Sequence, residues 1–466
     1  MNADLSLRED EVTWTLPDSK QDISLQLDLG NLDGGIAGID RFLEEQIEAV
    51  AGENLNEIER EISAQVVRET LKNIELETGK RGAIIYALTL PETQAMTSET
   101  SDAVPGEKLT LVLVVPEGPP IVKSVVLEPG QLERTLNILR QSIGSFSSQS
   151  YLPPSQQLYE WLIQPLEEHL EALDLDTLIF AMDAGLHQLP LAALHDGEEF
   201  LIERYSLGSI PSLSLTDTRY RSLQKATVLA MGASEFPQSD NQPLPAVPLE
   251  LEIVSGRSRQ LQTLRETARS PIDSHRTGQA FLNEEFTLEN LIEQRHKQPF
   301  EIVHLATHAD FNARERYETY IELWDRRLSL DELRLVEWYA PPMVELLVLS
   351  ACETAVGDRE AELGFAGLAV RAGVKSALAS LWKVDDTGTL VLMSQFYEHL
   401  QNAPIKAEAL RQTQLALLRG EVSVRDGYII GNGMRIPLPS ELHGWEGRDF
   451  SHPYYWSGFT MVGSPW

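Results

Sequence analysis

From residue 177 onward, short and almost continuously apolar segments alternate with longer segments of helical periodicity. The apolar segments lack polar–apolar alternation, which is typical of strands in a parallel sheet whose two faces are both covered. We expect strands at 177–182, 227–231, 300–306, 344–350, 376–381 and around 456–462. We expect helices at 249–263, 287–294, 361–372, 386–401 and 405–418. This alternation predicts an α/β domain of three layers, with a mostly parallel sheet between helices.

The residues before 177 follow a different pattern. Apolar residues recur at helical spacing over 38–78, and Gly79 is a natural helix stop. Three apolar strands are expected at 83–90, 109–115 and 121–127, and a tight Pro/Gly turn joins the last two as a hairpin. We divide the chain into a helix-rich region (1–79), an accessory strand-plus-helix half (80–176) and a main domain (177–466). The boundary between the halves stays open, because the strands of 83–127 could extend the later sheet.

Composition limits the function classes. The net charge is −33, from 71 acidic and 38 basic residues, and no Lys/Arg cluster stands out, so we expect no direct nucleic-acid binding. The excess of acidic residues is interpreted as a contribution to solubility. The alternative is that it attracts a partner or substrate with a basic surface. No apolar stretch is long enough to span a membrane and no signal peptide is recognisable, so we expect a cytoplasmic protein without membrane contact. No spacing typical of metal ligands occurs, and we expect neither metal nor cofactor.

Cys352 is the only cysteine of the chain. It follows the end of the apolar run 344–350, as His308 follows the end of the run 300–306. Chemistry gathers at the carboxyl ends of parallel strands, so the pair suggests a thiol nucleophile with an imidazole base. The alternative is a small buried thiol and a core histidine, which spacing alone favours. His304 lies inside its strand, and we interpret it as structural.

Several ordered motifs carry a resemblance to a known family. The chain resembles the CHAT domain, a caspase-like and separase-like cysteine peptidase domain. The match begins near residue 80 and is best from 177 onward. The segments that carry it are 182–194, 210–212, 243–252, 304–308, 349–354 with Gly357, 372–374, 380–386 and 452–456. The resemblance implies a caspase-like sandwich and assigns 80–176 as an accessory or pseudo-protease-like half.

The family implies an endopeptidase with Cys352 as nucleophile and His308 as general base. The oxyanion would be bound by the backbone amides of Cys352 and Ala309. The family residue at position 309 is commonly glycine. Alanine keeps the N–H, but a required positive φ would cost alanine more than glycine. No third catalytic residue is evident from the sequence.

The resemblance also places the substrate pocket after the fifth strand. Trp382 is a candidate apolar wall, with core packing as the alternative. Separases, which cut after arginine, carry an aspartate directly after the equivalent tryptophan, whereas this chain has Lys383, which argues against a basic-residue preference. The acidic candidates for the pocket, each with a turn, cap or surface role as its alternative, are Asp183, Glu353, Asp385 and Asp386.

Our first hypothesis is a thiol endopeptidase that cleaves a protein substrate once a partner or signal orders its site loops. By resemblance, it would act in bacterial regulation, defence or cell death. Its sensor would be a separate protein, or the amino-terminal 80 residues would stand in for one. The alternative is a catalytically silent interaction or scaffold module. A self-assembling scaffold built on the amino-terminal helices is compatible with either hypothesis, so a homo-oligomer stays open.

Overall fold

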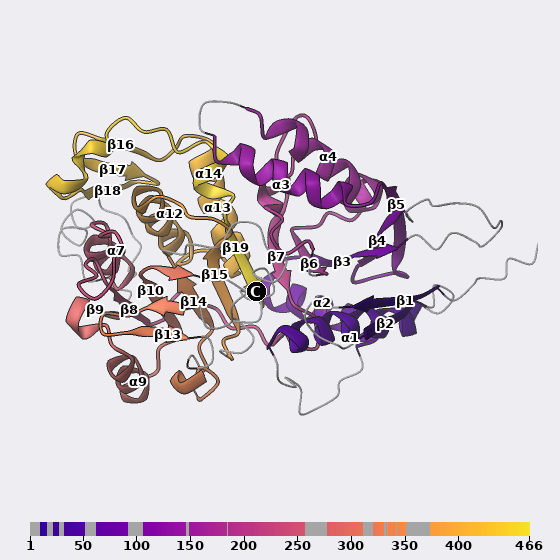
Figure 1. Cartoon of the computed structure of the whole chain (residues 1–466), viewed down its shortest axis with the longest axis horizontal. Helices are drawn as coiled ribbons and strands as arrows, with labels where there is room; N and C mark the ends of the chain where they lie inside the picture. The colour runs from indigo at the N-terminus through magenta and orange to yellow at the C-terminus, as the bar shows by residue number, and fades with distance from the viewer. Residues whose placement is uncertain are drawn as a thin grey trace, which may run out of the picture.

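The computed structural model places most of the chain (Figure 1). The described residues are 10–15, 22–27, 32–51, 62–91, 106–145, 149–183, 185–256, 277–310, 320–329, 332, 334–341, 343–350 and 373–466. Two of the expected site residues, Cys352 and Glu353, lie outside them. So does the helix expected at 361–372, and the helices and strands named in this structure belong to the placed residues alone.

An eleven-stranded sheet forms the centre of the fold, in the order β5-β4-β3-β6-β7-β19-β15-β14-β10-β8-β9. Its pairs are parallel except β3–β4, β4–β5 and β15–β19. The strands are β3 (Gly82–Pro91), β4 (Glu107–Val114), β5 (Ile121–Leu127), β6 (Thr177–Met182), β7 (Ser206–Ile210), β8 (Val228–Gly232), β9 (Gly278–Leu282), β10 (Ile302–Ala306), β14 (Leu346–Leu349), β15 (Ser376–Ser380) and β19 (Phe459–Gly463).

The antiparallel pairing of β15 with β19 reverses the sheet. The strands β3, β6, β7 and β19 run one way, while β15, β14, β10, β8 and β9 run the other way. The carboxyl ends of β6 and β10 therefore lie at opposite edges of one sheet. Binding and catalytic sites in α/β sheets lie at the carboxyl ends of parallel strands, so a site in one half of this sheet would lie at the opposite edge from a site in the other half.

Helices cover both faces of the sheet, which makes three layers (Figure 1). Successive β3 residues show this: Ile85 belongs to one buried cluster, with α3 and α4, and Tyr86 belongs to the other, with α1 and α2. The helices are α1 (Leu32–Ala51), α2 (Ala64–Thr78), α3 (Gln131–Ile143), α4 (Leu152–Leu162), α5 (Glu167–Ala172), α6 (Leu201–Arg204), α7 (Val247–Val254), α9 (Leu288–Lys297), α12 (Asp386–His399), α13 (Lys406–Leu418) and α14 (Pro453–Trp456).

Caps define the two ends of α2, and one buried carboxylate holds α1 to the chain that follows β7. Ser63 caps α2, and Gly79 ends it at φ 69°, the left-handed conformation that glycine adopts without strain. On α1, buried Asp40 accepts the backbone N–H groups of Leu213 and Ser214 at 2.7 and 3.0 Å. The helix-rich region therefore packs onto the segment that follows β7.

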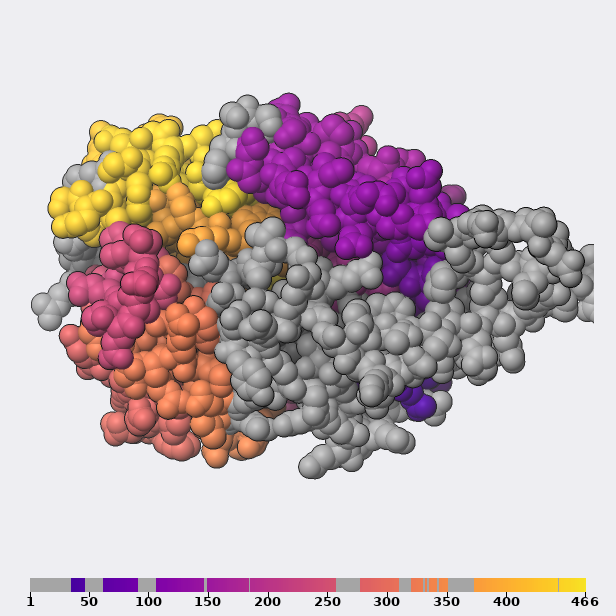
Figure 2. All heavy atoms as spheres, viewed as in Figure 1, coloured from indigo at the N-terminus to yellow at the C-terminus, as the bar shows by residue number. Residues whose placement is uncertain are grey.

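Three small sheets lie outside the central one. They are the pair β1 (Asp10–Thr15) and β2 (Asp22–Leu27), the hairpin β12 (Tyr320–Glu322) and β13 (Arg327–Ser329) with β11 (Ala309–Asp310), and β16 (Ser423–Arg425), β17 (Tyr428–Gly431) and β18 (Met434–Pro437). The last of these lies in the segment between α13 and α14. Figure 2 shows the carboxyl-terminal segment (yellow) at one end of the visible face, beside the α7 region (pink).

The predicted three-layer α/β architecture is confirmed. The strands expected from the apolar runs are all present within a few residues, and the parallel pairing of β3 with β6 shows that 83–127 does extend the later sheet. The hairpin β4–β5 is confirmed as well. The apolar pattern did not predict β1, β2, β7 and β9, nor the short strands β11, β12, β13, β16, β17 and β18. No described helix combines the length and apolar character needed to cross a membrane.

The three-layer arrangement predicts that both faces of β6 are sensitive to truncation. Leu178 and Ile179 point to opposite faces and are 0% and 1% exposed. We expect Leu178→Ala and Ile179→Ala each to lower the free energy of unfolding by about 2–5 kcal/mol, the usual cost of emptying such a site. Chemical denaturation measures this. Leu76→Ala on α2, where the side chain is 84% exposed, is the control and should be neutral. A neutral result at either β6 position would contradict a sheet covered on both faces.

Candidate active site

The site is built on the paired carboxyl ends of β10 and β14. These strands are parallel neighbours with Leu305 opposite Leu349, and the amide of Ser350 donates to the Leu305 carbonyl at 3.1 Å. His308 comes three residues after Leu305, and Cys352 comes three residues after Leu349. Cys352 lies outside the described residues. Covalent geometry alone limits the distance between the Cα atoms of Ser350 and Cys352 to about 7 Å.

His308 is held in the turn that leads from β10 into β11. The Thr307 hydroxyl donates to the Glu322 carbonyl at 2.6 Å, and the Glu322 amide donates to the His308 carbonyl at 2.9 Å. These bonds tie the turn to the β12–β13 hairpin. The His308 side chain is 8% exposed, so its position is set by packing as well as by the backbone.

A backbone carbonyl orients the imidazole. The His308 Nε2 lies 2.8 Å from the Gln242 carbonyl oxygen, and the ring packs against Phe236 with centroids 4.7 Å apart. A carbonyl only accepts hydrogen bonds, so Nε2 carries the proton and the lone pair of the neutral ring lies on Nδ1. The sequence analysis found no third group. It missed Gln242 because a main-chain carbonyl has no side-chain signature.

The loop that carries Gln242 is fixed at both ends. At its start, Gly232 has to be glycine, because a Cβ there would lie 2.4 Å from the Ala306 carbonyl oxygen of β10. Next, the Ala233 amide donates to that same carbonyl at 3.1 Å. At its end, the buried Ala246 amide donates to the Asp386 carboxylate at 2.8 Å. The loop is therefore hydrogen-bonded to the site strand β10 at its start and to the first residue of α12 at its end.

Ala309 adopts extended backbone in β11, opposite Ile321 of β12. The bond from the Glu322 amide to the His308 carbonyl makes this a non-hydrogen-bonded pair, whose own N–H groups point away from the partner strand. The Ala309 amide is therefore outside the β11–β12 ladder. Its backbone is not left-handed, so alanine replaces glycine here without the strain that a positive φ would cause.

A buried polar network lies beneath the site. His304, which is 0% exposed, contacts Glu250 of α7 through Nε2 at 2.9 Å and the Tyr397 hydroxyl of α12 through Nδ1 at 3.1 Å. His304 thus joins two helices to β10, in agreement with its structural interpretation. Burial, with smaller contributions from Glu250 and Asp385, raises the pKa of Asp386 to about 7.

The segment after β15 lies at the same edge as His308, because β15, β14 and β10 are parallel. Trp382 is 9% exposed, and its Nε1 donates to the Tyr454 carbonyl at 3.1 Å. Its ring leaves no room for a Cβ at Gly458, the nearest ring atom being 2.7 Å away. Lys383 is exposed. Asp385 caps α12 through the Gly388 amide at 2.7 Å and pairs with Arg448, so its carboxylate serves the helix start.

Asp183 lies elsewhere, which corrects its inclusion in the substrate pocket. It follows β6, whose carboxyl end is at the opposite edge of the sheet from that of β10. Its carboxylate accepts the amide of Thr89 at 2.6 Å and also the Thr89 hydroxyl, which holds β3 to the end of β6. The reversal at β15–β19 is a tertiary feature that a linear pattern of strand ends does not reveal. Glu353 lies outside the described residues.

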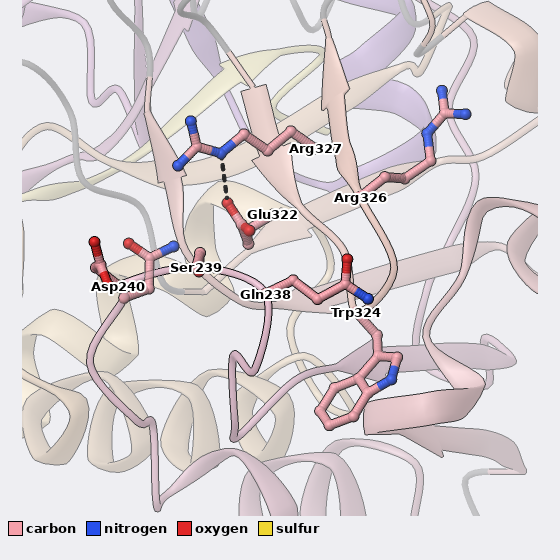
Figure 3. Close-up of a pocket in the computed structure, with 8 residues that line it drawn as sticks. Gln238, Ser239, Asp240, Glu322, Trp324, Arg326 and Arg327 are labelled. Atoms are coloured by element: carbon pink, nitrogen blue, oxygen red, sulfur yellow. Dashed lines mark hydrogen bonds and ion pairs between the residues drawn. The ribbon is translucent and has the colours of Figure 1, made fainter.

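A pocket of about 470 Å³ is lined in part by Glu322, whose amide donates to the His308 carbonyl, and by Asn241, which precedes Gln242 (Figure 3). It lies between the Gln242 loop and the β12–β13 hairpin, and it is lined by Gln238, Ser239, Asp240, Asn241, Glu322, Trp324, Arg326 and Arg327. Figure 3 shows Arg327 turned toward Glu322, with which it pairs at 3.0 Å. The Ser239 hydroxyl and the Asn241 amide nitrogen are buried without hydrogen-bond partners. No group of residues suited to hold a metal ion is present in the described part of the chain.

No curated protein matches the sequence. A chain of the Saccharomyces cerevisiae separase–securin complex superposes with a TM-score of 0.48 at 10% identity, over 93% of this chain and 34% of that chain. The present protein therefore spans about a third of that chain's length. The Arg-specific cysteine proteinase gingipain R superposes with a TM-score of 0.35 at 11% identity, over 72% of this chain and 74% of that one.

The CHAT domain matches residues 152–464, which is more than half of the chain. The matched region includes β10, β14 and His308 as well as the segment after β15. This protein belongs to the CHAT domain family.

Proposed function

We propose that this protein is a caspase-like cysteine endopeptidase, with Cys352 as nucleophile and His308 as general base. The observation that carries the proposal is the register of the two site strands. β10 and β14 are adjacent and parallel, with Leu305 opposite Leu349, and the imidazole and the thiol each follow three residues later. Two short chain segments of equal length, leaving neighbouring strands at one edge, can bring their side chains within reach of each other.

The orientation of His308 suits this chemistry. With Nε2 bound to the Gln242 carbonyl, Nδ1 takes the proton from the Cys352 thiol, and the thiolate attacks the carbonyl carbon of the peptide bond. The amides of Ala309 and Cys352 bind the oxyanion. The imidazolium then protonates the leaving amine, and water hydrolyses the thioester with His308 as base. The Gln242 carbonyl also stabilises the imidazolium by accepting its Nε2–H.

The substrate is a polypeptide that crosses the edge formed by β15, β14 and β10. The polar pocket lined by Asn241 and Glu322 provides a contact region for it, and Trp382, which is 9% exposed, packs beneath one end of this edge. Because the pocket contains both acidic and basic side chains, it suits polar substrate residues and backbone groups. Activation by a partner protein would act on the loops that complete the site.

Replacing the thiol tests the mechanism directly. We expect Cys352→Ala to reduce cleavage on the order of 10³-fold or more, because the remaining groups cannot form the acyl intermediate. Cleavage of an unbiased peptide library, together with the thermal unfolding curve, measures activity and folding separately. Ser350→Ala is a matched control from the same strand end, since the Ser350 hydroxyl is buried without a hydrogen-bond partner. Undiminished proteolysis by a folded Cys352→Ala variant would refute the nucleophile assignment.

Alkylation reports on the pair even when the activator is unknown. Since Cys352 is the only cysteine, each labelled molecule reports on that thiol. A base-activated thiol should react up to about 30-fold faster at pH 7 than an unperturbed one, which is only a few per cent ionised. We expect His308→Ala to remove this acceleration, while His296→Ala, at the exposed end of α9, should keep it. Labelling that requires denaturant would instead indicate an inert buried thiol and a silent module.

The pocket makes a separate prediction about binding. Asn241 lines this pocket, so a polypeptide bound there would contact its side chain, and Asn241→Ala should raise KM several-fold and leave kcat nearly unchanged. Steady-state kinetics with the best library peptide measures both constants. Gln156→Ala, at an exposed position of α4, is the control. Equal KM values in wild type and Asn241→Ala would place the substrate outside this pocket.

A further inference from the structure

Two adjacent aspartates at the start of α12 have different roles. Asp385 caps its own helix through the Gly388 amide and pairs with Arg448. Asp386 is not the cap, and its Oδ2 instead accepts the backbone N–H of Ala246 at 2.8 Å. Ala246 is 0% exposed, so its amide would otherwise be a buried donor without an acceptor. This hydrogen bond joins the start of α12 to the end of the Gln242 loop.

The chain between Ala246 and Gln242 is unusually stiff. The intervening residues are Pro243, Leu244 and Pro245, and proline fixes its own φ and restricts the residue before it. Pro243 therefore restricts the ψ angle of Gln242, which sets the direction of the Gln242 carbonyl. Leu244 is buried, and its amide donates to the Ser234 carbonyl at 3.0 Å. A displacement at Ala246 is consequently transmitted to the carbonyl that binds His308.

We propose that Asp386 is a positioning residue for His308: by binding the Ala246 amide, it holds the Gln242 carbonyl against Nε2 and so determines which imidazole nitrogen carries the proton. The proposal rests on the proposed function for its catalytic consequence. Its structural part, the tautomer of His308, does not depend on protease activity.

The charges around Asp386 make this hydrogen bond dependent on pH. Among the described residues, the groups that act on Asp386 are Glu250 of α7 and Asp385 of its own helix, and both disfavour its ionisation. Glu250 is paired with His304, and Asp385 with Arg448. With burial, they raise the pKa of Asp386 to about 7. The carboxylate, which accepts a hydrogen bond more strongly than the protonated acid, therefore forms as pH rises through neutrality.

The sign of the stability effect follows from the raised pKa. Between the ordinary value of 3.8 and about 7, the unfolded chain has lost the Asp386 proton while the folded protein still holds it. The folded state then binds more protons, so this residue makes the protein less stable as pH rises across that window. Asp386→Asn removes the titration and keeps an amide oxygen as acceptor. The Tm of Asp386→Asn minus the Tm of wild type should therefore increase as the pH is raised from 5 to 8.

The test compares Asp386→Ala, which removes the acceptor, with Asp386→Asn, which keeps one. Nitrogen NMR of histidine-labelled protein, with the His308 signal assigned by a His308→Asn variant, reports the tautomer. We expect wild type and Asp386→Asn to show the Nε2-protonated ring, and Asp386→Ala to lose that preference. In peptide cleavage, kcat should fall about 10- to 100-fold in Asp386→Ala with little change in KM, and Asp386→Asn should restore it.

A control separates positioning from general destabilisation. Ile179→Val, in β6 on the other half of the sheet, should lower the Tm modestly without altering the tautomer or kcat. An unchanged His308 tautomer in folded Asp386→Ala would overturn the proposal. A changed tautomer in a protein that cleaves no peptide would support the positioning role and count against the proposed function instead.

Discussion

The placement of β10 between β8 and β14 is the constraint on which the rest of the site depends. Parallel hydrogen bonds on both sides align the carboxyl ends of the three strands at the same edge of the sheet. From β8 comes the loop with Gln242, from β10 comes His308, and from β14 comes the segment that leads to Cys352. Adjacent strands of the sheet therefore carry His308, the carbonyl that orients its ring and the start of the segment that leads to Cys352.

Buried polar groups then determine how this edge is held. His304, Glu250 and Tyr397 are almost completely inaccessible, and buried groups of this kind are tolerated only when they are hydrogen-bonded to one another. Their network holds α7 and α12 to β10 at a position four residues before His308. The hydrogen bond between Asp386 and Ala246 connects α12 to the Gln242 loop as well, so the helices packed on the sheet also hold the loop that orients His308.

The strand–helix alternation was predictable because each element carries its own signal. Apolar runs such as 177–182 are buried on both faces wherever they are placed, and Gly79 ends a helix through its own backbone freedom. Strands whose burial depends on neighbours were missed. β7 consists largely of serine, glycine and other modest β-formers, and β9 is only half buried at the edge of the sheet. Their pairing partners, rather than their residues, make them strands.

In the candidate site too, some features were predictable from the residues themselves and others depend on the packing of neighbouring elements. The amino-acid sequence alone determined the two chemical groups, His308 and Cys352, and the strands that precede them, because side-chain type and local apolar pattern are encoded residue by residue. Tertiary structure alone decided that Gln242 orients the imidazole, that Asp386 reaches the Ala246 amide, and that Asp183 lies at the opposite edge. These relations depend on the order and direction of strands in the sheet, above all on the reversal at β15–β19, and on a backbone carbonyl that every residue possesses.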